Sequence, residues 1–345
     1  MRVLITGGAG FLGYHLANYL SNKNMGIVLC DIATFVKEEY PKNTTFHNID
    51  IKDKEGIEGI IQDVDIIAHA AAALPLWSKK DIFTTNVDGT RNVLDAALRN
   101  RVKRVVYISS TAVYGVPIKH PIIESDPLIG VGHYGKSKIG SEEVCREYIE
   151  KGLNVTILRP KTFLGPGRLG VFQILYDWVK SGKRIPILGN GHNRYQLLAV
   201  EDLTEAIYKF SMTESKESNG AFNIGAEIFG TVLEDIGALC DFANNGAKVL
   251  PLPAEPVKAV LRILETLKLS PLYKWIYETA DKDSFVSIDK IKRAIDYQPK
   301  FSNGQTLISS YQWYLDHCKE IGAKSGITHR VAWKQGALEL VKRFM

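Results

Sequence analysis

The feature that most constrains the fold lies at the start of the chain. Residues 3–5 (Val-Leu-Ile) are consecutive aliphatic residues, as expected of a parallel strand buried on both faces. Glycines follow at positions 7, 8, 10 and 13, and residues 14–20 carry apolar side chains at helical spacing. Strand, glycine turn and helix in this order are the context that a dinucleotide-binding fingerprint requires. The glycines let the turn close and let the backbone approach a pyrophosphate at the positive end of the helix.

A second apolar run, residues 26–31, ends in Asp31, at the distance from the glycines that places it beside the adenosine ribose. A carboxylate there accepts hydrogen bonds from the ribose hydroxyls and repels a 2′-phosphate, so it favours NAD over NADP. The alternative is a strand-end aspartate that only caps the next turn. The whole constellation favours the cofactor role.

Composition narrows the class of protein. The 345 residues suffice for a large core, and a dispersed net charge of +5 gives no argument for nucleic acid. The four cysteines lie far apart without a C-x-x-C pair, which predicts reduced thiols and no zinc site. The first strand directly follows Met1-Arg2, and the longest near-apolar run, residues 64–77, is too short to span a bilayer. We therefore expect a soluble, cytoplasmic protein without a bound metal.

The first half of the chain alternates strand and helix patterns, which predicts an α/β protein with a Rossmann-type doubly wound parallel sheet. The later part is irregular and predicts a smaller, mostly helical C-terminal substrate-binding domain. Further strands are expected at 44–50, 64–69, 104–110 and 155–160, and helices at 54–62, 81–99, 134–151, 232–240 and 255–269. The predicted domains are a Rossmann domain over 1–168, rejoined by 195–228, and a substrate-binding region over 169–194 and 229–345.

In such sheets, ligands bind at the carboxyl ends of the strands. That edge should therefore gather residues 7–13, Asp31, Asp50, residues 69–72, Ser110 and Pro160.

Ser110, Tyr134 and Lys138 are the candidate catalytic residues. A tyrosine and a lysine four residues apart lie on one helix face, and the ammonium lowers the pKa of the phenol from about 10 toward neutrality. The phenolate can then take a proton from a substrate hydroxyl while a hydride leaves the same carbon for the cofactor. Ser110, at the end of the preceding strand, would hydrogen-bond the developing carbonyl oxygen.

The Tyr-x-x-x-Lys spacing occurs three times and is not specific by itself. The other two pairs are Tyr19/Lys23, after the glycine turn, and Tyr176/Lys180, outside the alternating region. Only Tyr134 begins a helix shortly after a strand that ends in serines, and this context favours it.

Together these features resemble the extended short-chain dehydrogenase/reductases, the NAD-dependent epimerase/dehydratase family. The resemblance covers about residues 1–230 in the family's order. It is carried by residues 6–13, Asp31, Asp50, 69–71, 86–94, 109–115, Tyr134/Lys138 and Arg159-Pro160.

The resemblance implies a set of NAD-binding residues and a homodimer formed through the helices at 81–99 and 134–151. The implied set is Gly7, Gly10, Phe11, Leu12, Gly13, Asp31, Ile32, Asp50, Ile51, Ala70, Ala71, Ala72, Asn86, Ser109, Tyr134, Lys138 and Pro160. Asp50 and Ile51 would touch adenine, and residues 70–72 the pyrophosphate side. Plainer alternatives are that Asn86 caps its helix and that His69 satisfies a backbone partner.

Two features bear on the reaction. The family's sugar 4,6-dehydratases carry an Asp-Glu pair after the catalytic Ser/Thr, whereas this chain has Thr111 and Ala112, so a dehydratase is disfavoured. The family's nucleotide-sugar members place an arginine on a diphosphate shortly before a Val-Asp-Asp segment. Here that position is Tyr195, and Arg194 falls one residue early, which on an extended strand reverses the direction of the side chain. Arg194 either reaches the phosphate through a bulge or the arginine clamp is absent.

The substrate stays open between two classes. Residues 74–77, with Leu76 and Trp77, and the apolar helix at 255–269 resemble the sterol-dehydrogenase-like branch, which acts on bulky lipid alcohols; the alternative is that they form core or a dimer surface. The leading hypothesis is an NAD-dependent sugar-nucleotide epimerase acting at C4 of an NDP-sugar. The second is a 3β-hydroxysteroid-like dehydrogenase or ketoreductase, and a third is a non-catalytic NAD-binding regulator. The C-terminal stretch 329–344 combines basic residues with an apolar stripe that could lie on an anionic membrane, or dock as a terminal helix.

Overall fold

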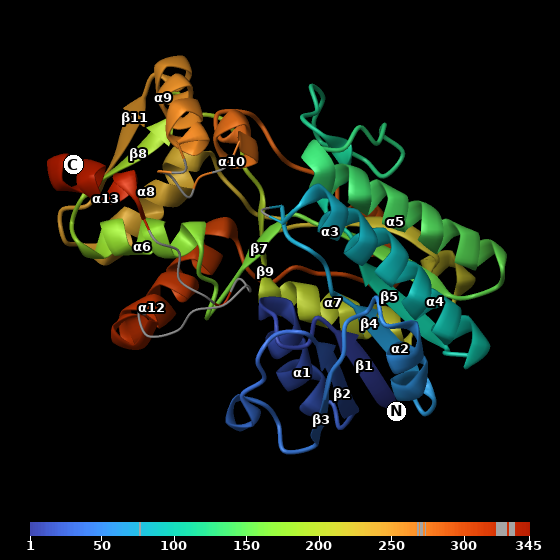
Figure 1. Cartoon of the computed structure of the whole chain (residues 1–345). Helices are drawn as coiled ribbons and strands as arrows, with labels where there is room; N and C mark the ends of the chain where they lie inside the picture. Colours follow the sequence, from blue (N-terminus) through green and yellow to red (C-terminus); the bar gives the residue numbers. More distant parts are fainter. Residues whose placement is uncertain (76, 268, 270–271, 273, 322–329, 331–334) are drawn as a thin grey trace. The chain divides into compact units, whose positions relative to one another are not determined.

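The computed structural model describes every residue except 76, 268, 270–271, 273, 322–329 and 331–334 (Figure 1). The chain forms two units. Unit 1 comprises residues 1–161, 200–224 and 286–298, and unit 2 comprises residues 162–199, 225–285 and 299–345. The chain thus leaves unit 1 and returns to it twice.

Unit 1 is organised around a parallel sheet of seven strands in the order β10-β6-β5-β4-β1-β2-β3 (Figure 1). The strands are β1 (Arg2–Thr6), β2 (Gly26–Asp31), β3 (Thr44–Asn48), β4 (Ile66–His69), β5 (Arg104–Ile108), β6 (Val155–Pro160) and β10 (Gly220–Ile224). β4, β5 and β6 are buried throughout, which explains their continuous apolar runs. The order reverses between β1 and β4, so the carboxyl ends of these two strands border the crevice where such sheets bind ligands.

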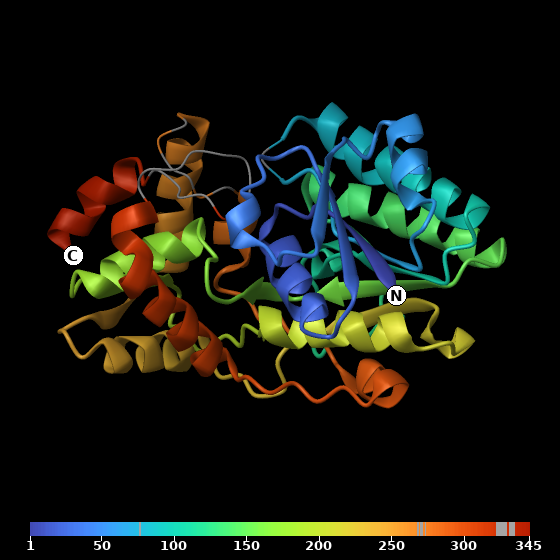
Figure 2. The ribbon, with the colours of Figure 1, turned by 90° about the horizontal axis from the view of Figure 1, so that it is seen from below.

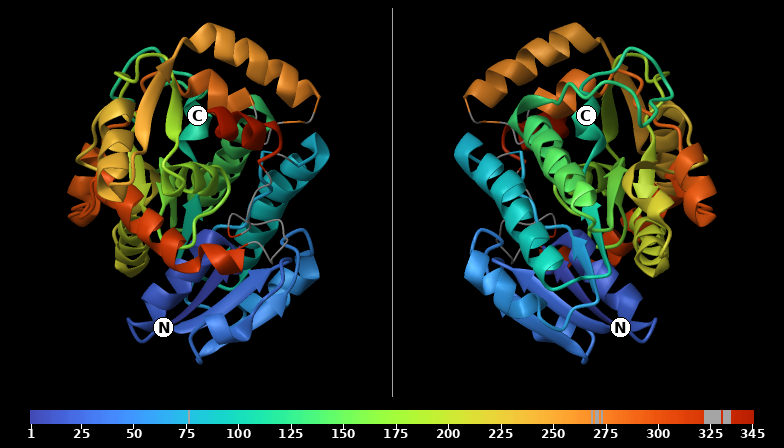
Figure 3. Two further views of the ribbon diagram at one scale, coloured as in Figure 1. Left: turned by 90° about the vertical axis from the view of Figure 1, so that its left-hand side faces the viewer. Right: turned by 90° about the vertical axis from the view of Figure 1, so that its right-hand side faces the viewer.

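Helices cover both faces of this sheet (Figure 2). They are α1 (Phe11–Ser21), α2 (Lys54–Ile61), α3 (Lys79–Phe83), α4 (Gly89–Arg99), α5 (Gly132–Glu150), α7 (Val200–Met212) and α11 (Asp289–Ile295). Shorter turns are η1 (Lys37–Glu39), the π-helical η2 (Thr84–Asp88), η3 (Thr111–Tyr114) and η4 (Lys216–Ser218). Figure 3 shows α4 and α5 side by side; Val93 and Val144 on these helices pack with Val105 and Ile157 of the sheet in one core cluster. α1 and α7 contact each other on the opposite face (Figure 2).

Unit 2 contains two short parallel ladders and a group of helices. β7 (Thr162–Leu164) pairs with β9 (Leu197–Ala199), and β8 (Arg184–Leu188) pairs with β11 (Lys248–Leu252). The helices are α6 (Val171–Lys180), α8 (Val232–Ala243), α9 (Ala254–Thr266), α10 (Lys274–Thr279), α12 (Asn303–Ile321) and α13 (Ala337–Phe344). Their core is rich in aromatic side chains, with Tyr176, Trp178, Tyr311 and Tyr314 in one cluster.

The predicted Rossmann-type doubly wound sheet with a helical C-terminal region is confirmed. Two details differ from expectation. Residues 286–298, expected in the substrate-binding region, lie in unit 1, where α11 contacts β10 and α7. The helix expected over 81–99 begins at Lys79 and widens into a π turn at Thr84–Asp88.

Over the described residues, no helix combines the length and apolar character needed to cross a membrane. The same part of the chain holds no cluster of three or more His, Cys, Asp or Glu side chains suited to a metal ion. All four cysteines are free; Cys30, Cys145 and Cys240 are buried and Cys318 is partly exposed.

Candidate active site

The glycine turn joins β1 to α1 at the point where the strand order reverses. Gly7 has φ +72°, a left-handed conformation that favours glycine, and a Cβ there would meet the backbone N of Ala71 at 2.8 Å. A Cβ on Gly13 would overlap the carbonyl oxygen of Gly7. The Gly7 N–H donates to the carbonyl of Cys30 at 2.8 Å, which fixes the turn against β2. Since Gly10 precedes α1 as an N-cap without a side chain, the turn fits a pyrophosphate placed at the helix N-terminus.

Asp31 lies at the end of β2 beside this turn. Its Oδ2 accepts the backbone N–H of Ala9 at 2.9 Å, and its Oδ1 accepts that of Ala33 at 2.9 Å. The second bond is an Asx turn, so the alternative capping role is also present. The first bond places the carboxylate against the glycine turn, as binding of the adenosine ribose requires. The next residue, Ile32, is 46% exposed and accessible to a ligand.

The segment after β3 contains the predicted adenine contacts Asp50 and Ile51. Asp50 Oδ1 accepts the N–H of Lys52 at 2.9 Å. The side chain of Ile51 is buried against the backbone of Gly89, so only its main chain could reach an adenine. Asp50 and Ile51 therefore stay predicted adenine contacts, made through a half-buried carboxylate and a main-chain segment.

The small residues after β4 lie against β1. The Ala70 N–H donates to the carbonyl of Thr6 at 3.2 Å, and the Ala71 N–H donates to Thr6 Oγ1 at 3.2 Å. Ala70 and Ala71 thus bring backbone next to Gly7 without bulky side chains in the way, and Ala72 follows them in the chain. This is compatible with the predicted place of a pyrophosphate.

His69 has a structural role, as the plainer alternative proposed, although its partners are hydroxyls. Its Nδ1 lies 2.6 Å from Thr6 Oγ1 and its Nε2 2.9 Å from Thr90 Oγ1. Burial, together with the charge of Lys138, lowers the pKa of His69 to about 3. The imidazole is therefore neutral and ties β1 to α4.

Asn86 is not a helix cap, so that alternative is wrong. It lies in the π turn, where Oδ1 accepts the N–H of Ala73 at 2.7 Å and Nδ2 donates to Ser137 Oγ at 2.9 Å. Ser78 caps α3 instead. Asn86 therefore joins the segment after β4 to Ser137 of α5, the residue that precedes Lys138.

Tyr134 and Lys138 lie together on α5. Lys138 is 2% exposed; its Nζ donates to the carbonyl of Ile108 at 2.8 Å and to the hydroxyl of Tyr107 at 3.2 Å. The same nitrogen is 5.9 Å from the ring centroid of Tyr134. Burial lowers the pKa of Lys138 to about 8, while the lysine stays predominantly protonated at neutral pH. A cation is thus fixed beside a partly buried phenol at the end of β5.

Ser110 follows β5 by two residues and caps η3, with its Oγ accepting the N–H of Ala112 at 3.1 Å. The first turn of α5 packs against this segment, because a Cβ on Gly135 would meet the Ala112 carbonyl oxygen at 2.6 Å. The structure therefore places Ser110 beside the start of the helix that carries Tyr134. Thr111 Oγ1 donates to the carbonyl of Pro160 at 3.3 Å, which joins the ends of β5 and β6.

The other two Tyr-x-x-x-Lys pairs lie in different surroundings. Lys23 is exposed, 5.5 Å from the Tyr19 ring centroid. Tyr176 is buried in the aromatic core of unit 2, while Lys180 Nζ donates to Cys318 Sγ at 2.9 Å. Only the Tyr134 pair adjoins the carboxyl ends of the sheet.

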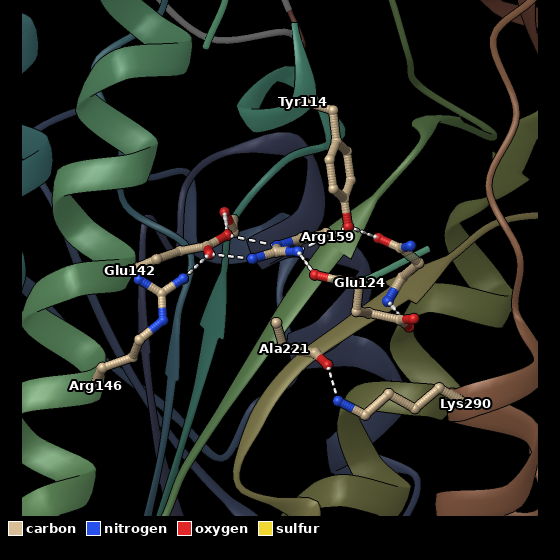
Figure 4. A network of polar contacts seen from close by, with 9 residues as sticks. Tyr114, Glu124, Glu142, Arg146, Arg159, Ala221 and Lys290 are labelled. Carbon is tan, nitrogen blue, oxygen red and sulfur yellow. Dashed lines mark hydrogen bonds and ion pairs between the residues drawn. The ribbon is translucent and has the colours of Figure 1, made fainter. Parts of the chain in front are cut away.

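The sequence prediction missed Glu142, the buried centre of a polar network behind the site (Figure 4). Its carboxylate accepts bonds from Ser109 Oγ at 2.6 Å and from Arg159 Nη2 at 2.6 Å. The predicted cofactor residue Ser109 is thus committed to Glu142 through its hydroxyl. The available signal was an acid eight residues after Tyr134, on the same side of a helix as Tyr134 and Lys138.

In unit 2, Arg194 and Tyr195 have different partners. The Arg194 guanidinium lies 4.6 Å from the ring centroid of Phe229 and 4.9 Å from that of Phe285. The Tyr195 hydroxyl lies 3.3 Å from Thr162 Oγ1. The Arg194 guanidinium therefore contacts two aromatic rings, and whether Arg194 clamps a diphosphate stays a prediction. Of the other predicted substrate residues, Trp77 is partly exposed and Leu76 lies outside the described residues.

Comparison with known proteins agrees with this geometry. Residues 3–225 match the model of the NAD dependent epimerase/dehydratase family. An uncharacterized protein of Sinorhizobium fredii, y4nG, is 32% identical over 344 residues, covering 98% of this chain and 85% of that protein. A UDP-N-acetyl-alpha-D-glucosaminuronate decarboxylase of Bacillus cytotoxicus is 27% identical, covering 91% of this chain and 98% of that protein.

Solved structures share the fold. The UDP-glucose 4-epimerase of Thermotoga maritima, solved with UDP-glucose, superposes with a TM-score of 0.76 at 22% identity and covers 92% of this chain and 100% of that one. The UDP-glucuronic acid 4-epimerase of Bacillus cereus, solved with NAD, gives 0.74 at 22% identity and covers 92% and 99%. The family model, the 32% identical relative and the glycine turn with Asp31 lead to one conclusion. The chain is an enzyme of the NAD-dependent epimerase/dehydratase family, and its cofactor is NAD.

Proposed function

We propose that this enzyme is a sugar-nucleotide epimerase that inverts a secondary alcohol, at C4 of an NDP-sugar, by transient oxidation. The observation that carries the proposal is the buried ammonium of Lys138, fixed on the carbonyl of Ile108 and facing the ring of Tyr134. A phenol next to a fixed cation is suited to exchange a proton with a substrate hydroxyl near neutral pH.

Each residue has a distinct task in this proposal. Tyr134 Oη takes the proton of the substrate hydroxyl and returns it after the keto-sugar intermediate has rotated in the site to present its other face. Lys138 stabilises the phenolate electrostatically. Ser110 Oγ donates a hydrogen bond to the same substrate oxygen. NAD, held at the glycine turn and by Asp31, supplies a reversible hydride acceptor.

The residues after Ser110 disfavour the elimination of water. Thr111 is bonded to the carbonyl of Pro160 and Ala112 has no titratable group, so neither position provides the acid or base that a dehydratase needs. The homologous decarboxylase and epimerases carry UDP-sugar names, which supports a nucleotide sugar as substrate. A homodimer through α4 and α5 and a cytoplasmic location stay predictions.

The test is a panel of UDP-, GDP-, CDP- and dTDP-sugars, incubated with the NAD-loaded enzyme and analysed by chromatography. We expect one sugar pair to interconvert without accumulation of NADH. Tyr134→Phe should abolish interconversion. The matched control is Tyr19→Phe, in the Tyr-x-x-x-Lys pair whose lysine is exposed, and it should leave interconversion unchanged. Failure of every nucleotide sugar to bind or react would overturn the proposal.

One observation supports a second function, oxidation of a bulky lipid alcohol. Arg194 lies between Phe229 and Phe285, and the uncharged Tyr195 takes the position where a diphosphate-binding arginine is expected. A site without that arginine suits an apolar substrate better than a diphosphate. NADH that accumulates steadily with hydroxysteroids would establish this function, and silence across such alcohols would exclude it.

A further inference from the structure

We propose that Glu142 is a positioning residue: it holds α5 against the ends of β5 and β6 and supplies the anion that keeps Lys138 cationic beside Tyr134. The inference rests on the function proposed above, because it serves the same two residues. Tyr134, Lys138 and Glu142 succeed one another at intervals of four, so they lie along one side of α5.

Both oxygens of the Glu142 carboxylate are occupied by donors from other elements (Figure 4). Oε1 accepts Ser109 Oγ at 2.6 Å and Arg159 Nε at 2.9 Å. Oε2 accepts Arg159 Nη2 at 2.6 Å and Arg146 Nη2, from its own helix, at 3.0 Å. The two-pronged bond from Arg159 fixes the orientation of the carboxylate as well as its position. Since Ser109 precedes Ser110, one carboxylate aligns the catalytic helix with the strand end that carries the predicted oxyanion donor.

Arg159 is itself immobilised on its other side. Its Nη1 donates to the Tyr114 hydroxyl at 2.7 Å and to the carbonyl of Glu124 at 3.0 Å. The Tyr114 hydroxyl donates to Asn223 Oδ1 at 2.6 Å on β10 (Figure 4). The network therefore joins β10, β6 and the loop before α5. A buried ion pair contributes little net stability compared with apolar residues of the same volume, so stability alone does not account for its presence.

Electrostatics give Glu142 its second role. The titratable groups that face Lys138 are Tyr107 of β5, His69 of β4, and Tyr134, Glu142 and Cys145 of α5. Burial raises the pKa of the Cys145 thiol and of the Tyr107 phenol, and it lowers that of His69 to about 3. These three groups are therefore neutral at pH 7. Glu142 is the carboxylate among the groups named here, and it is ion-paired with Arg159.

The removal of this anion has a direct consequence for Lys138. Burial already lowers the pKa of Lys138 to about 8, against the opposing influence of the Glu142 carboxylate. Without Glu142 the ammonium would lose its proton closer to neutrality. Tyr134 would then lose the cation that stabilises its phenolate.

The test is a titration of Lys138 by NMR, with lysine labelled at Cε and the protein saturated with NAD. A Lys138→Met protein assigns the resonance. We expect Glu142→Gln to move the titration midpoint of Lys138 down by about one pH unit. Because this variant leaves Arg159 buried and charged, the Glu142→Gln/Arg159→Gln protein is the decisive variant, and we expect it to fold and to show a downward shift that is smaller, since the bonded Arg159 cation is removed together with the anion. Arg146→Ala, which removes only a half-exposed partner of the carboxylate, should not shift the midpoint.

An unchanged midpoint in the folded double variant would overturn the proposal. So would a failure of both Glu142 variants to fold and retain NAD, because the pair would then serve the fold alone. The titration needs no sugar, so a negative result with the sugar panel leaves it intact. If sugars do turn over, the acid limb of the pH–rate profile should move to higher pH in the double variant, with KM little changed.

Discussion

At the scale of single residues, surroundings separate a functional side chain from a similar one elsewhere. The tyrosines of the three Tyr-x-x-x-Lys pairs share a spacing, but only Lys138 is buried against the end of a central strand. The spacing was visible in the sequence for all three pairs. The Tyr134/Lys138 pair could be selected because its helix follows a strand that ends in serines. The partner of Glu142 was not visible, because Glu142 lies on α5 and Arg159 on β6, and nothing local links the two.

The glycine turn gives a first prediction. In Gly13→Ala the new methyl group would overlap the carbonyl oxygen of Gly7, so we expect a loss of about 1–3 kcal/mol in the free energy of unfolding. NAD affinity should fall by roughly tenfold or more, as 1.4 kcal/mol corresponds to one decade. Gly59→Ala is the matched control, because no atom lies within 4 Å of a Cβ at that helical position. Denaturant titration and calorimetric NAD binding measure both, and equal behaviour of the two variants would contradict the prediction.

His69 gives a second prediction, on acid sensitivity. The unfolded chain binds a proton at this imidazole below about pH 6.5, whereas the folded protein does so only near pH 3. Its contribution to stability is therefore fully present above pH 6.5 and is lost as the pH falls toward 3. Between pH 6.5 and about pH 5 the loss should amount to about 2 kcal/mol. Urea unfolding across this range should show a shallower dependence in His69→Gln, and parallel curves would refute the assignment.

At the scale of elements, periodicity predicted most strands and helices, because an apolar run buried on both sides needs no tertiary information to be recognised. The π turn at Thr84–Asp88 was not predicted. It depends on Asn86 bonding to Ala73 and Ser137, two partners in other elements, and the local spacing of apolar residues does not reveal such a widening.

The π turn gives a third prediction. Asn86→Ala would leave the buried N–H of Ala73 without its acceptor, so we expect a destabilisation of about 1–3 kcal/mol and weaker retention of NAD. Thr84→Ala in the same turn removes an exposed hydroxyl bonded within the helix and should change stability by less than about 0.5 kcal/mol. Thermal unfolding with and without NAD distinguishes them. Equal losses in the two variants would show that the turn, rather than the Asn86 bridge, is responsible.

At the scale of the whole molecule, unit 1 is assembled from three separate stretches of chain. A return of the chain over residues 195–228 was expected from a strand and helix pattern, and residues 200–224 lie in unit 1. The return of residues 286–298 was not, because a short helix with one buried face carries no sign of which core it joins. Lys290 Nζ donates to the carbonyl of Ala221 at 2.7 Å, a contact between segments 69 positions apart.

This arrangement gives a fourth prediction. Ile291 on α11 is fully buried, so Ile291→Ala should lower the free energy of unfolding by about 2–5 kcal/mol. Because α11 packs on β10 and α7, the loss should appear in unit 1 and reduce the NAD that survives purification. Arg293→Ala, on the exposed side of the same helix, should behave as the wild type. Hydrogen exchange localised to unit 2 in the Ile291 variant would contradict this placement.

The three-part construction of unit 1 also sets an order of events during synthesis. The glycine turn and Asp31 are synthesised well before β10, which is complete only at residue 224, and before α11, which is complete only at residue 295. Since domains fold as units, the sheet cannot reach its final form while the nascent chain is short. The dinucleotide fold is therefore completed only after β10 and α11 have been synthesised, and until then the edge of β6 that pairs with β10 has no strand partner.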